Sequence, residues 1–409
     1  VEFHNGKTMT ADDVITSINL HRGADSKSAS KPLYDPVKEI VKDDDHTVVF
    51  RLESGNADFP FIVSDYHSAI LPEVDGKPDW RSGIGTGAYV IQDFEPGVRT
   101  FSKRNPNYWK EGRAHFDEVE SIAIIDANAR QNAVATDEVD VIDRVDTKTV
   151  RLLARTPNLN ILETTGTLHY TFPMHTDKPP FDNNDVRMAL KLAVDREQLV
   201  EKILHGHGAL GNDHPISTAN RFHASEIPQR TYDPDKARWH AKQAGMPDLT
   251  VDLSAADAAF GGAVDAAVLM KEHASKAGIT INVVREPNDG YWANVWTVKP
   301  WCACYWGGRP TEDWMFSAAY AAGADWNDTN WKHERFNELL VVARAELNEA
   351  RRREMYVEMQ QITRDEGGVL CPMFANHVHA LRDRVRHEEN VAGNWQLDGN
   401  KCNERWWFA

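Results

Sequence analysis

The sequence has few cysteines and no long apolar run, and these absences exclude several classes of protein. Four cysteines among 409 residues are too few for a scaffold built on disulfides. No stretch of about 18 apolar residues is present, so we expect no transmembrane helix. Acidic residues outnumber basic ones, and the net charge of −16 argues against nucleic acid or anionic lipid as a partner.

The sequence also lacks the local motifs of common enzymes. It has no Gly-x-Ser-x-Gly elbow, no phosphate-binding loop and no His-Glu-x-x-His helix. We therefore expect a protein that is not an enzyme and needs no cofactor. A hydrolase whose catalytic residues come together only in space is the alternative from another class.

What the sequence does contain is typical of a globular protein with a large core. Apolar residues make up 41% and charged residues 26% of the chain, and the length favours two domains. The opening "VEFHNGKTMTADDV" predicts a strand, a turn at Asn5-Gly6 and a helix, with Thr10 and Asp13 as a capping pair. A strand edge at residue 1 leads us to expect that earlier sequence is missing.

The spacing of apolar residues changes along the chain. Before residue 176 it favours strands, at 47–53, 119–125 and 160–176, with a hairpin over 86–104 and a helix over 128–136. After about residue 186, predicted helices alternate with strands. Helices are expected over 186–203, 233–245, 263–277, 332–347 and 349–365. This alternation predicts an α/β fold.

Cysteine and histidine each occur in pairs one residue apart. Cys302 and Cys304 fall on one face of a predicted strand. The four cysteines either form one disulfide, whose pairing the sequence leaves open, or remain as buried thiols. His205, His207 and His214 lie in "HGHGALGNDH", and a second pair, His377 and His379, lies on a predicted strand. Such histidines can hold a transition metal or simply make hydrogen bonds, and we favour hydrogen bonds.

The strongest candidate for a ligand site is "YWGGRPTEDWMF", residues 305–316, in the tryptophan-rich part of the chain. Glycines such as Gly308 allow a sharp turn after a strand, where α/β domains meet their ligands. Arg309 suits a ligand carboxylate, whereas Glu312 and Asp313 suit an ammonium group. Indoles around them would exclude water; they are those of Trp306 and Trp314. The alternative is an internal Arg–acid ion pair that caps a helix beginning near Trp314.

Several segments, taken together, resemble one protein family. They are "VEFHNGKTMTADDVITSI", "IGTGAYVIQDFEPGVRTFSKRNPNYW", "FDEVESIAIIDANARQNAVATDEVDVI", "KPPFDNNDVRMALKLAVDREQLV", "YDPDKARWHAKQAG" and "GVLCPMFANH". In this order they are similar to segments of the extracytoplasmic solute-binding proteins of ABC importers, family 5, the group that binds oligopeptides, dipeptides, nickel and opines. The match extends from residue 1 to about residue 380.

The resemblance implies a two-lobed periplasmic-binding-protein fold of type II, in its large variant with an extra subdomain. The subdomain would span 1–80, lobe I 81–173 with a return over 374–409, and lobe II 174–373. Two hinge strands would cross between the lobes at Tyr170–Pro173 and Met373–Asn376. The N-terminal part of lobe I would be missing. Tyr170 and Asn376 at these crossings would contact the ligand.

The resemblance also implies a function. Such a protein would be a periplasmic monomer that binds a small molecule between its lobes and delivers it to an ABC permease in the inner membrane. Peptide-binding members carry an acid near the strand end, where this chain has "WGGRPTEDWMF" with Arg309 close by. We therefore expect a small carboxylate-bearing solute, either an opine-type conjugate or a short peptide. The alternative within the family is a metal or metallophore, bound in a nickel-like manner.

Overall fold

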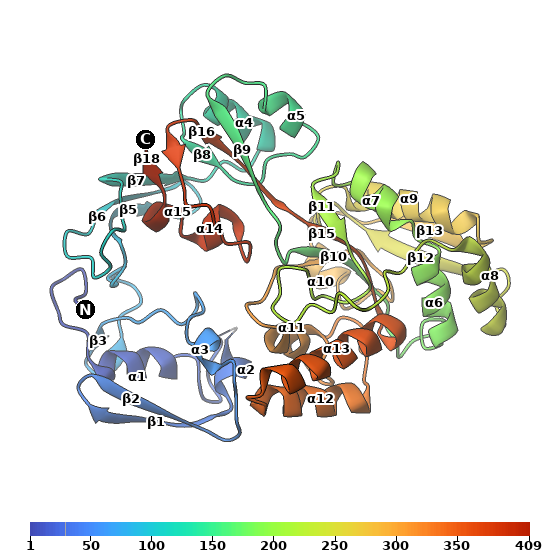
Figure 1. Cartoon of the computed structure of the whole chain (residues 1–409), viewed down its shortest axis with the longest axis horizontal. Coiled ribbons are helices and arrows are strands. Elements are labelled where there is room, and N and C mark those ends of the chain that lie inside the picture. The colour runs from blue at the N-terminus through green and yellow to red at the C-terminus, as the bar shows by residue number, and fades with distance from the viewer. Residues whose placement is uncertain (29) are drawn as a thin grey trace.

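The computed structural model describes residues 1–28 and 30–409 and shows an N-terminal unit and two lobes (Figure 1). The N-terminal unit has a small core of Ile18, Tyr34, Val37 and Ile62. Asp13 accepts from the backbone N–H of Thr10 at 2.8 Å, as expected of a capping pair. The elements of this unit are α1 (Ala11–Asn19), α2 (Lys31–Tyr34), β1 (Val37–Asp44), β2 (Thr47–Leu52), α3 (Phe59–Ile62), β3 (Glu73–Val74) and β4 (Lys77–Pro78).

Lobe I is assembled from two separate parts of the chain. Its first part holds β5 (Tyr89–Glu95), β6 (Arg99–Arg104), β7 (Glu118–Ile122), α4 (Ala127–Ala135), β8 (Val141–Ile142), α5 (Val150–Leu153) and β9 (Leu159–Thr164). The C-terminal return adds β16 (His377–Arg382), β17 (Val385–Arg386), α14 (Gln396–Asn400), α15 (Cys402–Arg405) and β18 (Trp407–Phe408). The return is integral to the lobe because β16 is the central strand of the sheet β8-β16-β9.

Lobe II contains the largest apolar core and alternates helices with strands. Its sheets have the orders β11-β15-β10-β14 and β12-β13, and the second pair is parallel. The strands are β10 (His169–Pro173), β11 (Gly208–Leu210), β12 (Thr250–Ala255), β13 (Thr280–Arg285), β14 (Cys304–Trp306) and β15 (Val369–Ala375). The helices are α6 (Asn184–Leu192), α7 (Arg196–Lys202), α8 (Pro234–Gln243), α9 (Ala263–Ser275), α10 (Tyr291–Asn294), α11 (Glu312–Ala319), α12 (Glu334–Ala345) and α13 (Glu349–Glu366).

Side-chain caps explain where several of these helices begin. Asp233 accepts from the backbone N–H of Lys236 at 2.8 Å and starts α8. The helix ends before Gly245, whose backbone has a left-handed conformation. The single helix expected over 186–203 is instead two helices. Asp195 caps the second of them by accepting from the N–H of Gln198 at 3.0 Å.

The chain passes between the lobes at two places. The first passage is residues 165–168, between β9 of lobe I and β10 of lobe II, and the second is at Asn376, between β15 and β16. We expected the first crossing at Tyr170–Pro173, but those residues are β10 and are paired with both β14 and β15. Sheet pairing on both edges fixes them within lobe II, so the crossing falls before them.

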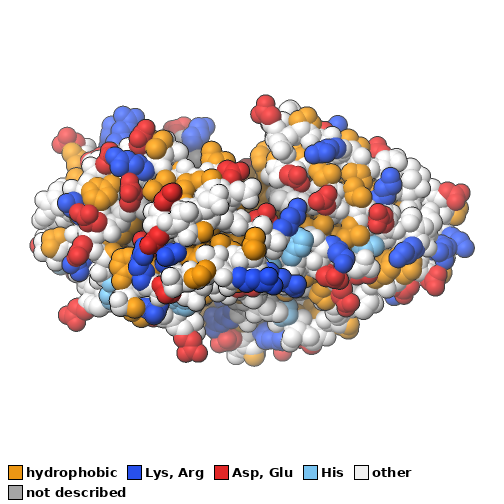
Figure 2. Space-filling view, turned by 90° about the horizontal axis from the view of Figure 1, so that it is seen from above, with side chains coloured by type: hydrophobic (Ala, Val, Ile, Leu, Met, Phe, Trp, Pro, Cys, Tyr) orange, Lys and Arg blue, Asp and Glu red, His pale blue; other side chains and the backbone are white. Residues whose placement is uncertain are grey.

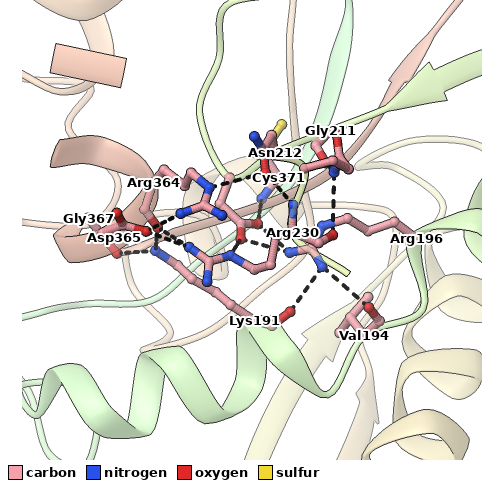
Figure 3. A network of polar contacts seen from close by, with 12 residues as sticks. Lys191, Val194, Arg196, Gly211, Asn212, Arg230, Arg364, Asp365, Gly367 and Cys371 are labelled. Carbon is pink, nitrogen blue, oxygen red and sulfur yellow. Dashed lines mark hydrogen bonds and ion pairs between the residues drawn. The ribbon is translucent and has the colours of Figure 1, made fainter. Parts of the chain in front are cut away.

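A buried polar network holds the crossing strand β15 against α6 and α7 (Figure 3). Asp213 is fully buried and accepts from Arg196 at 2.8 and 2.7 Å and from Arg230 at 2.7 Å. The same carboxylate accepts from the backbone N–H of Cys371 in β15 at 3.1 Å. Lys191, also fully buried, donates to the carbonyl oxygens of Arg364 and Gly367. Lobe II therefore fixes one end of the second crossing.

Two further expectations concerned the state of the cysteines and the presence of a transmembrane helix. All four cysteines are free thiols, and those at 302, 304 and 371 are buried in lobe II. Burial raises the pKa of Cys304 well above its usual value, as expected of an unreactive thiol. In the part of the chain that the structure describes, no helix is both long and apolar enough to cross a bilayer.

Candidate functional site

A cavity of about 760 Å³ lies between the two lobes, beside both crossings. Lobe I contributes the loop that contains Arg144 and Lys148, strand β16 and the segment around Trp395. Lobe II contributes Tyr170, Tyr305 and the loop between β12 and α9. Because both lobes form its walls, the volume of this cavity depends on the angle between them.

Aromatic rings form the lobe II side of the cavity. Tyr170 stacks on Phe260, with ring centroids 4.0 Å apart and planes 5° from parallel. Burial raises the pKa of Tyr170 to about 12, so its hydroxyl stays protonated at neutral pH. Tyr305 on the edge strand β14 is 44% exposed and lines the same space. These rings offer an apolar surface to the uncharged part of a ligand.

Two glycines allow the lobes to approach closely at one end of the cavity. A Cβ at Gly307 would lie 3.1 Å from the indole of Trp395 in lobe I. A Cβ at Gly308 would lie 1.4 Å from Oγ1 of Thr167 in the first crossing. A larger residue at 308 would therefore collide with the crossing, which explains why glycine is required there.

The cavity walls carry charges of both signs. Arg144, Lys148 and Lys202 supply cations. Asp146, Asp257 and Asp265 supply carboxylates. His377 and His379 also line the space, and burial lowers the pKa of His377 to about 4, so that its ring is neutral at pH 7. Such walls suit a polar ligand with ionised groups better than a purely apolar one.

Three of the predicted site residues line the cavity: Tyr170, Gly308 and Asn376. Asn376 lies at the second crossing, where its amide donates to Oε1 of Glu163 at 2.6 Å. The other carboxylate oxygen of Glu163 lies 2.9 Å from Nδ1 of His207 in lobe II. Asn376 therefore belongs to a polar contact that joins the two lobes at the hinge.

Trp306 and Trp314 are buried in lobe II and are absent from the cavity wall. The indole N–H of Trp306 donates to Asp328 at 3.2 Å, and that of Trp296 donates to the same oxygen at 3.1 Å. Asp328 is fully buried, and burial outweighs these hydrogen bonds and raises its pKa to about 6. No local pattern in the sequence indicated this carboxylate, because its partners lie 22 and 32 residues away.

Arg309 follows the turn that lines the cavity but is itself outside the wall. Its Nη1 donates to the carbonyl oxygens of Gly307 at 3.1 Å and Gly308 at 3.3 Å. The guanidinium carbon lies 6.0 Å from the ring centroid of Trp306 and 5.9 Å from that of Trp314. The geometry thus places Arg309 where it stabilises the turn, and direct contact with a ligand carboxylate stays a prediction.

Glu312 and Asp313 begin α11 and are buried among protein partners. Glu312 accepts from the backbone N–H of Phe222 at 2.7 Å, and Asp313 pairs with Arg344 at 3.1 Å. Burial raises the pKa of both carboxyls. The alternative in which these acids pair with Arg309 is wrong, because their partners are other groups. Contact between either acid and a ligand ammonium stays a prediction.

The histidines are not gathered into a metal site. His214 is buried, and its ring centroid lies 6.3 Å from that of His223. His205 and His207 instead line a groove at the cavity mouth. Among residues 1–28 and 30–409, no three His, Cys, Asp or Glu side chains come together as ligands for a metal ion. The cavity residues that the sequence missed come from loops far apart in the chain.

Comparison with known proteins finds similarity over the whole of this architecture. Residues 1–328 match the family described as bacterial extracellular solute-binding proteins, family 5. The chain is 28% identical to heme-binding protein A of Haemophilus influenzae over 276 residues, which cover 61% of this chain and 50% of that protein. It is 23% identical to the dipeptide-binding protein of Escherichia coli K12, covering 96% of this chain and 80% of that protein.

Two solved structures share the fold. One is AgaA of Agrobacterium tumefaciens R10 in complex with agropinic acid, with a TM-score of 0.83 and 22% identity, covering 100% of this chain and 85% of that chain. The other is NikZ of Campylobacter jejuni in complex with Ni(L-His), with a TM-score of 0.84 and 18% identity. The match covers 100% of this chain and 86% of the NikZ chain. The two-lobed architecture is thus shared with proteins whose ligands differ. This chain spans about half the length of the heme-binding relative.

Proposed function

Because this chain belongs to family 5 of the bacterial extracellular solute-binding proteins, we propose that it captures a small solute between its lobes and delivers it to a membrane permease. The observation that carries this proposal is the cavity of about 760 Å³ with walls from both lobes and two chain crossings beside it. A solute that touches both walls favours the closed form, because its differential affinity shifts the equilibrium between open and closed states.

The solute that we propose carries a carboxylate and is an opine-type conjugate or a short peptide. Arg144 and Lys148 offer cations on one wall, and Asp257 and Asp265 offer acids on the other. The relatives are consistent with this class, since one is called a dipeptide-binding protein and one structure holds agropinic acid. The aromatic floor of Tyr170 and Phe260 would take the apolar part of the solute.

A metal or metallophore and a hydrolytic reaction are less well supported. The nickel complex bound by a structural neighbour supports the metal alternative. Against it, no group of three side chains that could ligate a metal ion exists among the described residues. The matched relatives are named for binding, and delivery of a solute requires no bond to be broken. We propose a monomer outside the cytoplasm, with an ABC permease as its partner.

Among the predicted residues, we assign Tyr170, Gly308 and Asn376 to ligand contact and Arg309 to holding the turn at Gly307 and Gly308. Arg309→Ala is expected to weaken solute binding more than tenfold, which corresponds to about 1.4 kcal/mol or more. Calorimetry on the folded variant measures this change, and unchanged affinity would refute the role.

The proposal is tested by screening free peptides, opines, sugars and metal salts for an increase in melting temperature. Only the native state offers the cavity, so a bound solute stabilises it. Each hit is then followed by small-angle scattering, where closure is expected to reduce the radius of gyration. Independently, mass spectrometry of the freshly purified protein identifies any solute from the cell that remains bound to it. If neither screen nor mass spectrometry yields a solute that closes the lobes, the proposed function is wrong.

A further inference from the structure

A groove of about 450 Å³ opens at the mouth of the cavity and is lined by basic side chains from both lobes. Lobe I supplies Lys148 and Arg151, at the start of α5. Lobe II supplies Lys202 at the end of α7, followed by His205 and His207. Lysine and arginine thus contribute three side chains to this lining and acidic residues contribute one, Glu201, on a chain whose net charge is −16.

Figure 2 shows the molecule from above, with Lys and Arg side chains in blue, histidines in pale blue and acidic side chains in red. Basic and histidine side chains lie near the middle of that face, with acidic side chains among them (Figure 2). In Figure 1, α5 and α7 lie on either side of the gap at the top of the molecule. The cations thus belong to elements that move relative to each other when the lobes close.

Among the described residues, the cations of the groove have either no ion-pair partner or only an exposed one. In the described part of the chain, Lys148 and Arg151 make no ion pair. Lys202 pairs with Glu201 at 2.8 Å, but both side chains are more than half exposed, and such a pair contributes little stability. An incoming anion would therefore meet available donors instead of competing with a strong internal ion pair.

His205 adds an observation that is independent of the charges. Its backbone has a φ of +52°, a left-handed conformation that is uncommon for a residue other than glycine. Its Nε2 is buried and has no hydrogen-bond partner in the structure. Strained backbone conformations cluster at ligand sites, and a buried polar atom without a partner can be satisfied by a bound group.

From these features we propose that the groove is an anion subsite, which takes a carboxylate or phosphate group of the bound solute. This inference rests on the proposed function, since it places an acidic group of the solute at the mouth of the cavity. Because Lys148 and Arg151 come from one lobe and Lys202 from the other, an anion between them attracts both and favours closure. The solute class is therefore narrowed to compounds that carry an acidic group at the end facing the mouth.

The first test uses anions alone and does not depend on the identity of the solute. Citrate and pyrophosphate are added separately to the wild type, to the double variant Lys148→Gln/Arg151→Gln and to the control Lys38→Gln/Arg285→Gln. The control removes the same charge from exposed positions on β1 and β13. Sodium chloride at matched ionic strength accounts for screening.

We expect both anions to raise the melting temperature of the wild type and the control variant, and to raise that of the groove variant by less than half as much. An equal rise in all three proteins would overturn the anion subsite, as would no rise in any of them. If these anions stabilise through the groove while no solute closes the lobes, only the proposed function fails.

The second test compares peptides that differ in one acidic group. Calorimetry is carried out with Ala-Glu against Ala-Gln for the carboxylate and Ala-phosphoserine against Ala-Ser for the phosphate. We expect the acidic member of at least one pair to bind about tenfold more tightly, an advantage that disappears in the groove variant. The preferred pair identifies carboxylate or phosphate as the group recognised. Equal affinities within both pairs, or an acidic advantage that survives in the groove variant, would contradict the proposal.

Discussion

Asp213 illustrates how one buried charge can organise a lobe. Its carboxylate is fully buried and satisfies two guanidinium groups and one backbone N–H. The cations Arg196 and Arg230 lower its pKa, although burial alone would raise it. The group therefore remains ionised at neutral pH and holds β15 in register with the loop that precedes α8.

Replacing this carboxylate is expected to be costly. Asp213→Asn leaves the buried Arg196 without its counter-charge and leaves Arg230 with Asp365 alone, so we expect a loss of about 3–5 kcal/mol in the free energy of unfolding. Urea denaturation measures the loss. Glu39→Gln is the control, because Glu39 and its partner Arg51 are half exposed or more and contribute at most about 1 kcal/mol. If the two variants were equally stable, the buried network around Asp213 would not be what stabilises lobe II.

Asp328, a second buried carboxylate, leads to a prediction about how the stability of the protein depends on pH. Burial raises its pKa to about 6 in the folded protein, above the ordinary value of 3.8. Between these values the folded state holds a proton that the unfolded state has lost, so this group contributes stability that decreases as pH rises through the window. We expect Asp328→Asn to lose this dependence. Lowering the pH from 7 to 5 should therefore raise the melting temperature of the wild type relative to that of the variant. A difference that stays constant with pH would contradict the assignment.

At the scale of elements, the first crossing depends on a close approach between Gly308 and Thr167. Gly308→Ala would place a Cβ 1.4 Å from Oγ1 of Thr167, and we expect the forced shift to destabilise the protein by about 1–3 kcal/mol. Thr167→Gly in the same chain removes the colliding atoms and is expected to restore part of the loss. Thermal unfolding measures both variants.

The matched control for that crossing is Gly87→Ala. A Cβ at Gly87 would meet no atom within 4 Å, so this substitution is expected to leave stability unchanged or slightly improved. If Gly308→Ala behaved like the control, the crossing would tolerate a side chain and the close approach would not be a constraint.

The helices and strands also show how far a single sequence predicts local structure. The cap Asp233 and the stop Gly245 defined α8 correctly, because both act through neighbouring backbone groups. The break between α6 and α7 was missed, since apolar spacing continues across it while Asp195 starts a new helix. Likewise, Tyr170–Pro173 was taken for a crossing because pairing partners of β10 lie more than 100 residues away.

At the scale of the whole molecule, the N-terminal unit contacts lobe II through a buried ion pair. Asp58, before α3, receives two hydrogen bonds from Arg352 on α13, and both side chains are 5% exposed. The backbone N–H of Ala57 also donates to the carbonyl of Arg344 at 2.8 Å. We predicted that residues 1–80 are a subdomain of lobe I, and these contacts show that the unit also packs against lobe II (Figure 1).

Breaking this pair should loosen the contact. Asp58→Asn leaves Arg352 buried without its counter-charge, and we expect about 3–5 kcal/mol less protection for the surrounding amides. Hydrogen exchange of residues 55–63 and of the first turns of α13 measures the change. Arg353→Gln, which removes a neighbouring exposed pair with Glu226, should have little effect. Equal protection in both variants would show that the unit is held by other contacts.

The sequence by itself determined the α/β character, most helices and strands, and the family resemblance, because apolar periodicity, caps and collinear motifs are local properties of the chain. Only the tertiary structure decided which residues form the cavity and that Trp306, Trp314, Asp213 and Asp328 are buried. These outcomes depend on contacts between segments far apart in sequence. Desolvation and hydrogen-bond partners exist only once the chain has folded, and one sequence carries no separate signal for them.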